Sequence, residues 1–79
     1  MVTVHRAYGF RFALYTNDHD PAHVHLLGHG GEAKVMLDPV SVVWAIGIPR
    51  AELRRLLHEV SSQQGLLMLK WKELHEGRP

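Results

Sequence analysis

The stretch from residue 16 to residue 25 is the part of the chain densest in groups that bind metals or move protons. It holds three histidines, two aspartates and an asparagine. Imidazole and carboxylate side chains do both kinds of chemistry near neutral pH. Asn17, Asp18 and Pro21 favour a tight loop, because Asn and Asp bond to nearby backbone and Pro fixes φ. The next residues alternate polar and apolar, as in a half-buried strand, which predicts His23 and His25 on one strand face.

One hypothesis for this stretch is a metal site. On a strand, the Cα atoms of His23 and His25 lie roughly 6.6 Å apart, at a rise of about 3.3 Å per residue. Their imidazoles can converge on one divalent ion such as zinc, with Asp18, His19 or Asp20 joining from the loop. The predicted metal ligands are His19, His23 and His25. The same spacing also binds nickel or zinc adventitiously in a chain with seven histidines.

A second hypothesis uses the same two histidines without a metal. One neutral and one protonated imidazole coexist near neutral pH, so His23 and His25 can act as catalytic base and acid. With Arg11, Lys34 or Tyr15 beside the phosphate, the pair suits cleavage of RNA by its own 2′-hydroxyl. The chain has no cysteine and no serine near this cluster, so neither side chain supplies a nucleophile there.

A third, purely structural interpretation needs no ligand. Asp18 or Asn17 then caps the turn, His19 bonds to loop carbonyls, and Pro21 stiffens the entry to the strand. The strand histidines are in that case ordinary surface residues. The sequence therefore leaves open whether the chain is an enzyme. The predicted binding residues of the loop and sheet face are Tyr15, Asn17, Asp18, His19, Arg11 and Lys34.

Composition limits the class of protein. A chain of 79 residues lies near the lower limit for one hydrophobic core. We expect a single domain over 1–79, with a sheet in 1–47 and two helices in 48–77. The absence of cysteine excludes disulfides and thiolate metal sites, which fits a reducing cytoplasm. No apolar run would span a membrane and no signal peptide begins the chain, while a net charge of +1 does not by itself indicate a nucleic-acid binder.

The arrangement of apolar residues predicts an antiparallel meander of about five strands. The strand-like stretches are 2–5, 10–15, 23–27, 32–37 and 40–46. Gly9 supplies a positive φ for the first turn, and three glycines in 28–31 form another. Asp38 followed by proline predicts the start of a type I turn.

The register follows because the apolar residues must share one face. The first hairpin sets Val4 opposite Phe12, and pairing across the central loop sets Phe12 opposite Leu26. The last turn sets Val35 opposite Trp44, which places this tryptophan in the core. The other face, mostly polar, is predicted to carry His5, Arg11, Ala13, Tyr15, His23, His25, Glu32, Lys34 and Met36, with Val43 and Ala45 at its far edge.

Two helices follow the predicted sheet. Apolar residues recur at helical spacing from Leu53 to Val60, and residues 61–65 interrupt this pattern as a bend or short loop. A second helix is expected from about Leu66 to His75, ended by Gly77 and Pro79. The fold class is therefore α+β, an antiparallel meander with two C-terminal helices packed on one face.

The stretch Asn17-Asp18-His19-Asp20-Pro21-Ala22-His23-Val24-His25 resembles a family signature. It is similar to the Asn-Asp-His-x-Pro-Pro-His-x-His motif of small bacterial proteins catalogued as domain of unknown function 4160. The resemblance covers nearly the whole chain, including Gly9-Phe10-Arg11, Gly31-Glu32-Ala33, the Pro49-Arg50 helix start and Leu67 to Trp71. Ala22 departs from the second proline of the family, which implies a less rigid loop.

The resemblance implies that the chain binds a partner, and it implies no particular catalytic reaction. Members resemble components of compact two-gene modules, often beside domain of unknown function 2442, and are suspected toxin–antitoxin components. The leading hypothesis is a module of that type that binds RNA or a cognate small protein from a neighbouring gene through its His-rich loop and sheet face. The alternative is a metal-binding or metal-free His-dependent ribonuclease. An exposed edge strand, or a patch of Val43, Ala45 and Met36, would also suit a homodimer.

Overall fold

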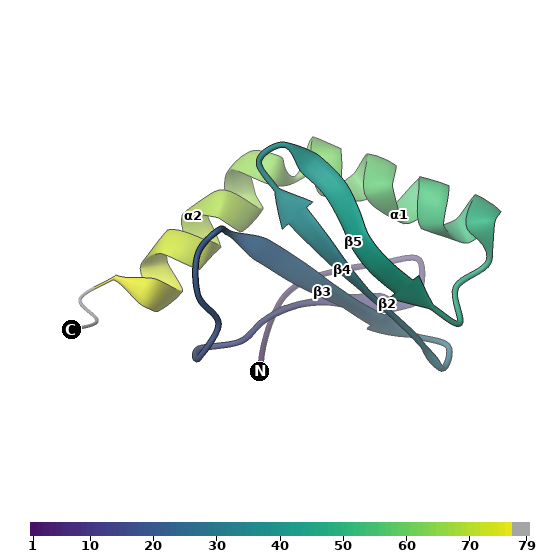
Figure 1. Cartoon of the computed structure of the whole chain (residues 1–79), viewed down its shortest axis with the longest axis horizontal. Coiled ribbons are helices and arrows are strands. Elements are labelled where there is room, and N and C mark those ends of the chain that lie inside the picture. Colours follow the sequence, from purple (N-terminus) through teal and green to yellow (C-terminus); the bar gives the residue numbers. More distant parts are fainter. Residues whose placement is uncertain (77–79) are drawn as a thin grey trace.

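The computed structural model describes residues 1–76 as a five-stranded antiparallel sheet followed by two helices (Figure 1). The order of the strands in the sheet is their order in the chain, which confirms the predicted α+β meander. Gly77 and Pro79, expected to end the second helix, lie outside the described residues. The elements are β1 (Val2–Ala7), β2 (Phe10–Leu14), β3 (His23–Gly28), β4 (Gly31–Leu37), β5 (Val40–Ile46), α1 (Arg50–Ser62) and α2 (Gln64–His75).

Two of the hairpins turn at the predicted positions. Tyr8 and Gly9 connect β1 to β2 with φ values of 56° and 79°, and His29 and Gly30 connect β3 to β4 with 49° and 76°. Positive φ at both central residues is the type I′ turn, whose twist matches that of the flanking strands. Leu26 pairs with Phe12, and His25 pairs with Lys34, as the sequence predicted. The centre of the sheet is therefore in the expected register.

The last hairpin differs from the prediction. Leu37 pairs directly with Val40, so Asp38 and Pro39 are the two central residues of the turn. The predicted type I turn, with Asp first and Pro second, is therefore wrong, because Pro stands at the third position. Val43 is then an extra residue in β5 and forms a bulge, after which Trp44 pairs with Lys34. A bulge moves the following side chain to the opposite face. Trp44 therefore lies on the outer face of the sheet, 36% exposed, and not in the core.

A second irregularity in β1 overturns the predicted face of His5. The register shifts between Thr3 and His5, so that His5 instead of Val4 pairs with Phe12. The His5 ring packs edge-on against Phe12, with centroids 5.0 Å apart, and its Nε2 lies 2.6 Å from Oε2 of Glu59 on α1. His5 therefore faces the helices and does not belong to the polar outer face.

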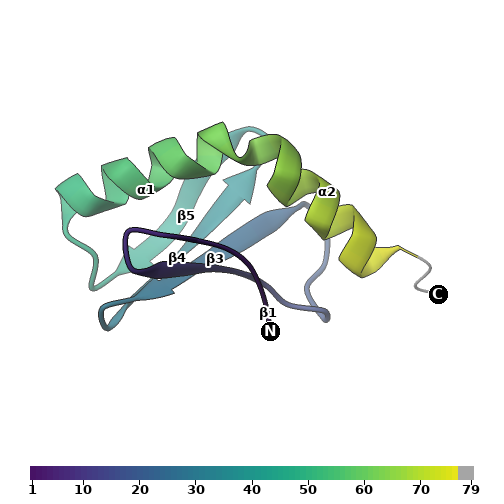
Figure 2. The same cartoon turned by 180° about the vertical axis from the view of Figure 1, so that it is seen from behind.

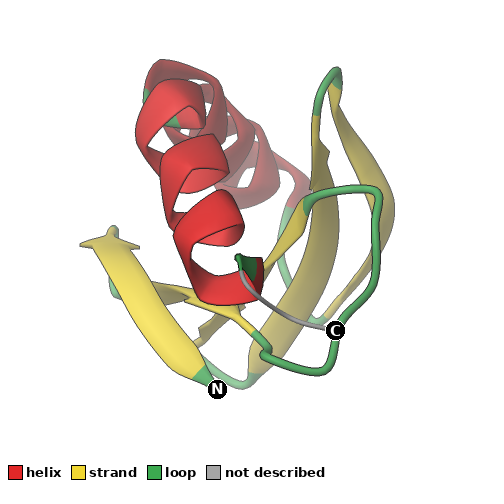
Figure 3. Cartoon of the chain, turned by 90° about the vertical axis from the view of Figure 1, so that its left-hand side faces the viewer, coloured by secondary structure: helices red, strands yellow, loops and turns green. Residues whose placement is uncertain are grey.

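The two helices cover one face of the sheet and enclose the core. They are joined at the single residue Gln63, a narrower break than the predicted 61–65, and run across the sheet with a bend between them (Figure 2). Seen from one end, the strands curve around the helix pair (Figure 3). Phe12, Leu26, Leu56 and Leu67 are among the fully buried side chains between the two layers. Neither helix of residues 1–76 is long and apolar enough to cross a membrane.

Candidate metal site

The start of β3 and the loop before it bring three potential metal ligands together on the outer side of the sheet. His23 and His25 project from the same side of β3, because side chains two residues apart share a strand face. The loop 15–22 carries Asp18 beneath them. Two backbone hydrogen bonds hold this loop: the Asp18 N–H donates to the Tyr15 carbonyl (3.2 Å), and the Leu37 N–H of β4 donates to the Ala22 carbonyl (3.1 Å).

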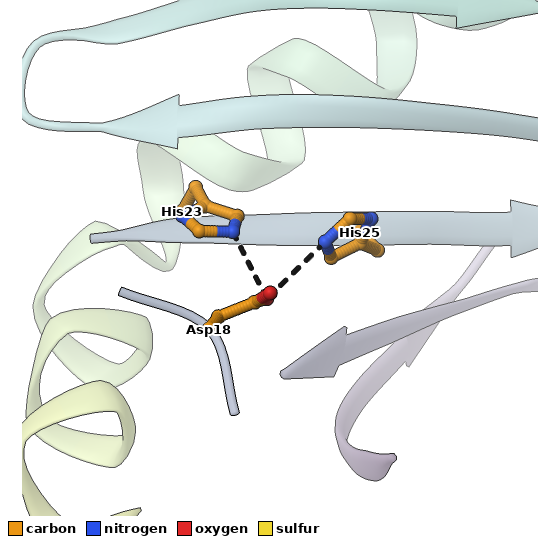
Figure 4. Close-up of side chains that lie close together, drawn as sticks. All are labelled: Asp18, His23 and His25. Carbon is orange, nitrogen blue, oxygen red and sulfur yellow. Dashed lines mark hydrogen bonds and ion pairs between the residues drawn. The ribbon is translucent and has the colours of Figure 1, made fainter. Parts of the chain in front are cut away.

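The three side chains converge on one point (Figure 4). Oδ2 of Asp18 lies 2.9 Å from Nε2 of His23 and 3.4 Å from Nε2 of His25. One ligand atom from each residue lies within 4.8 Å of the other two. A tetrahedral zinc ion with ligands at about 2.0–2.1 Å separates neighbouring ligand atoms by about 3.3–3.4 Å. The distance from Asp18 to His25 matches this spacing, and the distance from Asp18 to His23 is shorter.

Both ring nitrogens of His23 face oxygen atoms that accept hydrogen bonds. Nδ1 lies 2.9 Å from the backbone carbonyl oxygen of Pro21, and Nε2 points at the Asp18 carboxylate. A neutral imidazole has only one N–H and can donate to only one of these two oxygens. The other ring nitrogen can face its oxygen favourably only if it carries a second proton or if a metal cation lies between them. Metal-ligating histidines commonly donate their non-ligating N–H to a backbone carbonyl or a carboxylate. The Pro21 carbonyl orients His23 in this way, with Nε2 toward Asp18.

His25 differs from His23, since neither of its ring nitrogens forms a hydrogen bond in the part of the chain that the structure describes. Both are buried, and neither has a hydrogen bond within residues 1–76. Its Nε2 faces Asp18, and its Nδ1 is 3.7 Å from Oε2 of Glu32 on β4. Burial lowers the pKa of His25, although the Asp18 carboxylate acts in the opposite direction. The resulting neutral imidazole offers the lone pair that a metal ion requires.

Aromatic rings pack around the two histidines. The Trp71 indole of α2 lies 5.0 Å from the His23 ring and donates from Nε1 to Oδ1 of Asp20 at 3.2 Å. The Tyr15 ring meets His25 edge-on at 4.6 Å. His23 is consequently only 5% exposed. Tight packing of this kind restricts the rotamers of both histidines and so holds the geometry of the candidate site.

The remaining predicted residues lie at different distances from this cluster. Lys34 pairs with His25 across β3 and β4, so it borders the site. His19 and Asn17 are exposed on the loop and stand outside the group of converging ligands. Arg11 is exposed and pairs with Leu27, which lies two residues after His25 on β3. Among the loop residues, the structure thus brings Asp18 and not His19 to the two strand histidines.

Sequence reasoning missed three contributors to the site. Glu32 was placed on the correct face but given no role, although the predicted register makes it a diagonal neighbour of His25. Trp44, whose ring lies 6.4 Å from that of His25, was concealed by the bulge in β5. The Pro21 carbonyl carries no signal in the sequence, because a backbone acceptor is identified only by the path of the loop.

Comparison with known proteins identifies a family but gives no biochemical activity. A family model described as "Domain of unknown function (DUF4160)" matches residues 9–72, which include the loop, the three converging side chains, all of α1 and most of α2. No curated protein and no solved structure matches the chain.

Proposed function

The chain belongs to the DUF4160 family, and we propose that it binds a divalent transition-metal ion, zinc in the first place, through Asp18, His23 and His25. The observation that carries this proposal is the convergence of two imidazole Nε2 atoms on one carboxylate oxygen at 2.9 and 3.4 Å. The nitrogens of His25 support it, because they are buried and form no hydrogen bond within residues 1–76, and a buried polar atom in that state is destabilising unless a ligand binds to it.

Three protein ligands fit an open coordination shell. Structural zinc sites usually have four protein ligands, whereas catalytic sites have three and keep a position for water or substrate. Two histidines and one carboxylate also occur in sites for iron, and neutral imidazole suits zinc, copper and nickel. Zinc in such a shell lowers the pKa of bound water and polarises carbonyl or phosphoryl oxygens. The proposed function is therefore metal binding of the kind that supports hydrolysis.

The first experiment is a zinc titration of untagged protein by isothermal calorimetry, with cobalt as a second probe of geometry. We expect one ion per chain for the natural sequence. Asp18→Asn and His23→Gln should each weaken binding by at least about a hundredfold, because each removes one of only three ligands.

The matched control for this titration is His19→Gln. It changes an exposed histidine of the same loop and should leave zinc affinity unchanged. Equal losses in the His19 and His23 variants, or a stoichiometry well below one ion per chain, would refute the proposed ligand set.

A second candidate is the toxin–antitoxin-type role, in which the same face binds RNA or a cognate partner protein. The observation that favours RNA is a row of side chains across three strands, where His25 pairs with Lys34 and Lys34 pairs with Trp44. A cation beside an exposed indole suits a phosphate and a stacked base. In the metal-free version of this candidate, His23 and His25 act as acid and base.

RNA cleavage assays separate these alternatives. Cleavage that persists in a chelator and disappears in a His23→Gln, His25→Gln double variant would support the metal-free pair. Cleavage that requires added zinc would support the metal site. Binding without cleavage, lost in Lys34→Ala and Trp44→Ala, would support an RNA-binding module, whereas a stable complex with the product of a neighbouring gene would support a partner protein.

A further inference from the structure

The strand β5 forms one edge of the sheet and is unusually open. It pairs with β4 on one side, and residues 1–76 provide no strand on its other side. Its seven residues, VSVVWAI, contain no charge and no proline. Val43 and Ile46 are 51% and 69% exposed. The other edge strand, β1, carries Arg6 in addition to His5.

An open edge of this kind is a template for another strand. Its outward N–H and C=O groups are unpaired, and natural proteins usually protect such edges with lysines, prolines or covering elements. The exposed apolar side chains of β5 add an area that would be removed from water by pairing. The outer edge of β5 is therefore suited to strand addition.

We propose that β5 pairs in antiparallel orientation with β5 of a second copy of this chain, around a two-fold axis close to Val43. The two five-stranded sheets then form one continuous sheet, and the interface uses the same surface of both copies. This proposal concerns the edge of the sheet and is independent of the proposed metal site.

The bulge in β5 favours a second copy of this chain, and not an unrelated strand, as the pairing partner of this edge. Val43 divides the edge into two regular runs, 40–42 and 44–46. A straight strand laid along this edge would lose register at the bulge. Around a two-fold axis at Val43, the first run of one copy faces the second run of the other, and the two bulges meet at the axis.

The charges at the two ends of β5 favour the same arrangement. Asp38 is exposed just before the strand, and Arg50 is exposed at the start of α1 just beyond its other end. Antiparallel pairing brings the acidic end of one copy toward the basic end of the other, twice by symmetry. The uncharged strand between them brings no like charges together, which would otherwise destabilise the pairing.

A single cysteine at the axis tests the proposal, because the natural chain has none. In antiparallel pairs, facing Cα atoms lie about 4.5–5.5 Å apart, within the range of about 4.4–6.8 Å that a disulfide spans. We expect V43C, oxidised with diamide, to form a covalent dimer in high yield. The matched control V2C, at an exposed apolar position in β1, should remain mostly monomeric.

Charge pairs at the same position provide the second test. V43K and V43E should each raise the dimer dissociation constant at least tenfold, measured by sedimentation of variants whose circular dichroism matches the natural protein. A mixture of the two should restore association. A natural protein that stays monomeric at millimolar concentration, or a dimer that persists in V43K and V43E, would overturn the proposal.

Discussion

Two histidine–carboxylate clusters lie on opposite faces of the same sheet and differ in whether all of their imidazoles form hydrogen bonds. On the helix side, one imidazole, His5, meets one carboxylate, Glu59, at 2.6 Å. On the outer side, two imidazoles share the carboxylate of Asp18, the Glu32 carboxylate lies 3.7 Å from His25, and His25 forms no hydrogen bond within the described part of the chain. The first cluster forms its hydrogen bond within the protein, whereas in the second a bound cation would supply the partner that His25 lacks among residues 1–76.

This difference shows how the same residue types serve structure or binding. A histidine paired one-to-one with a carboxylate balances its charge and its hydrogen bonds, and therefore stabilises the contact between β1 and α1. In the outer cluster, His25 has carboxylate oxygens at 3.4 and 3.7 Å but no hydrogen bond to any described residue, which leaves a ring lone pair for a metal or a proton. The presence or absence of hydrogen bonds to the imidazoles, more than the number of histidines, distinguishes the two clusters.

The largest expected effect is stabilisation of the outer cluster by zinc. At a free zinc concentration about a hundred times Kd, binding should add about 2.7 kcal/mol to the free energy of unfolding. For a domain of this size, that raises Tm by roughly 10–20 °C, as measured by circular dichroism. Asp18→Asn should show at most about 3 °C of shift, and Glu59→Gln should show the full shift. A full shift in both variants would remove the distinction between the clusters.

The next effect concerns the helix-side pair. Glu59→Gln should cost about 1.5 kcal/mol of stability, the lower end of the range for hydrogen bonds to charged groups, because both side chains remain about one-fifth exposed. Urea denaturation of zinc-free protein measures this loss. Zinc affinity should stay unchanged. If Glu59→Gln instead weakened zinc binding and left stability intact, the assignment of a purely structural role would be wrong.

A smaller effect is expected from Glu32. When Nε2 of His25 binds a metal, its Nδ1 carries the proton and can donate to the Glu32 carboxylate, now 3.7 Å away. Losing such a partner typically weakens metal binding at least tenfold, or by about 1.4 kcal/mol. Calorimetry on Glu32→Gln should show this loss, while Glu73→Gln, on the exposed surface of α2, should not. An unchanged affinity in Glu32→Gln would show that His25 is oriented by packing alone.

The smallest effect is the pH dependence of the zinc-free protein. Burial lowers the pKa of His25 in the folded state, so the unfolded chain binds more protons in the range between the lowered and the ordinary value. Stability should therefore fall as pH decreases through this range. His25→Gln should flatten the dependence, and His58→Gln, exposed on α1, should not. Equal slopes in the natural protein and in His25→Gln would contradict this origin.

The sequence predicts the fold and half of the site, for a reason that individual strands make clear. Strict alternation in β3 and β4 places Leu26 inward and His23 and His25 outward, because a one-residue slip would bury the polar set. The same rule fails for His5 and Trp44, since a bulge adds a residue without leaving a mark in the alternation. The alternation of polar and apolar residues therefore predicts the regular strands but misses the bulges, after which the side chains point to the opposite face.

The loop ligand was harder to predict than the strand ligands. Asp18, His19 and Asp20 are adjacent and all have suitable chemistry, but only one can face the histidines. The choice depends on the turn closed by the Asp18 N–H and on the hydrogen bond that holds Asp20 to Trp71. The second of these contacts joins residues 51 positions apart, so no local pattern identifies it.

The positions of the tryptophans have a practical consequence. The chain contains two, and each indole lies beside a different histidine of the site, Trp71 at 5.0 Å from His23 and Trp44 at 6.4 Å from His25. One is 4% exposed and the other 36%, so their emission maxima should differ. All tryptophan fluorescence of the unlabelled protein thus originates next to the candidate ligands, and the molecule carries its own optical probe for each of the two imidazoles.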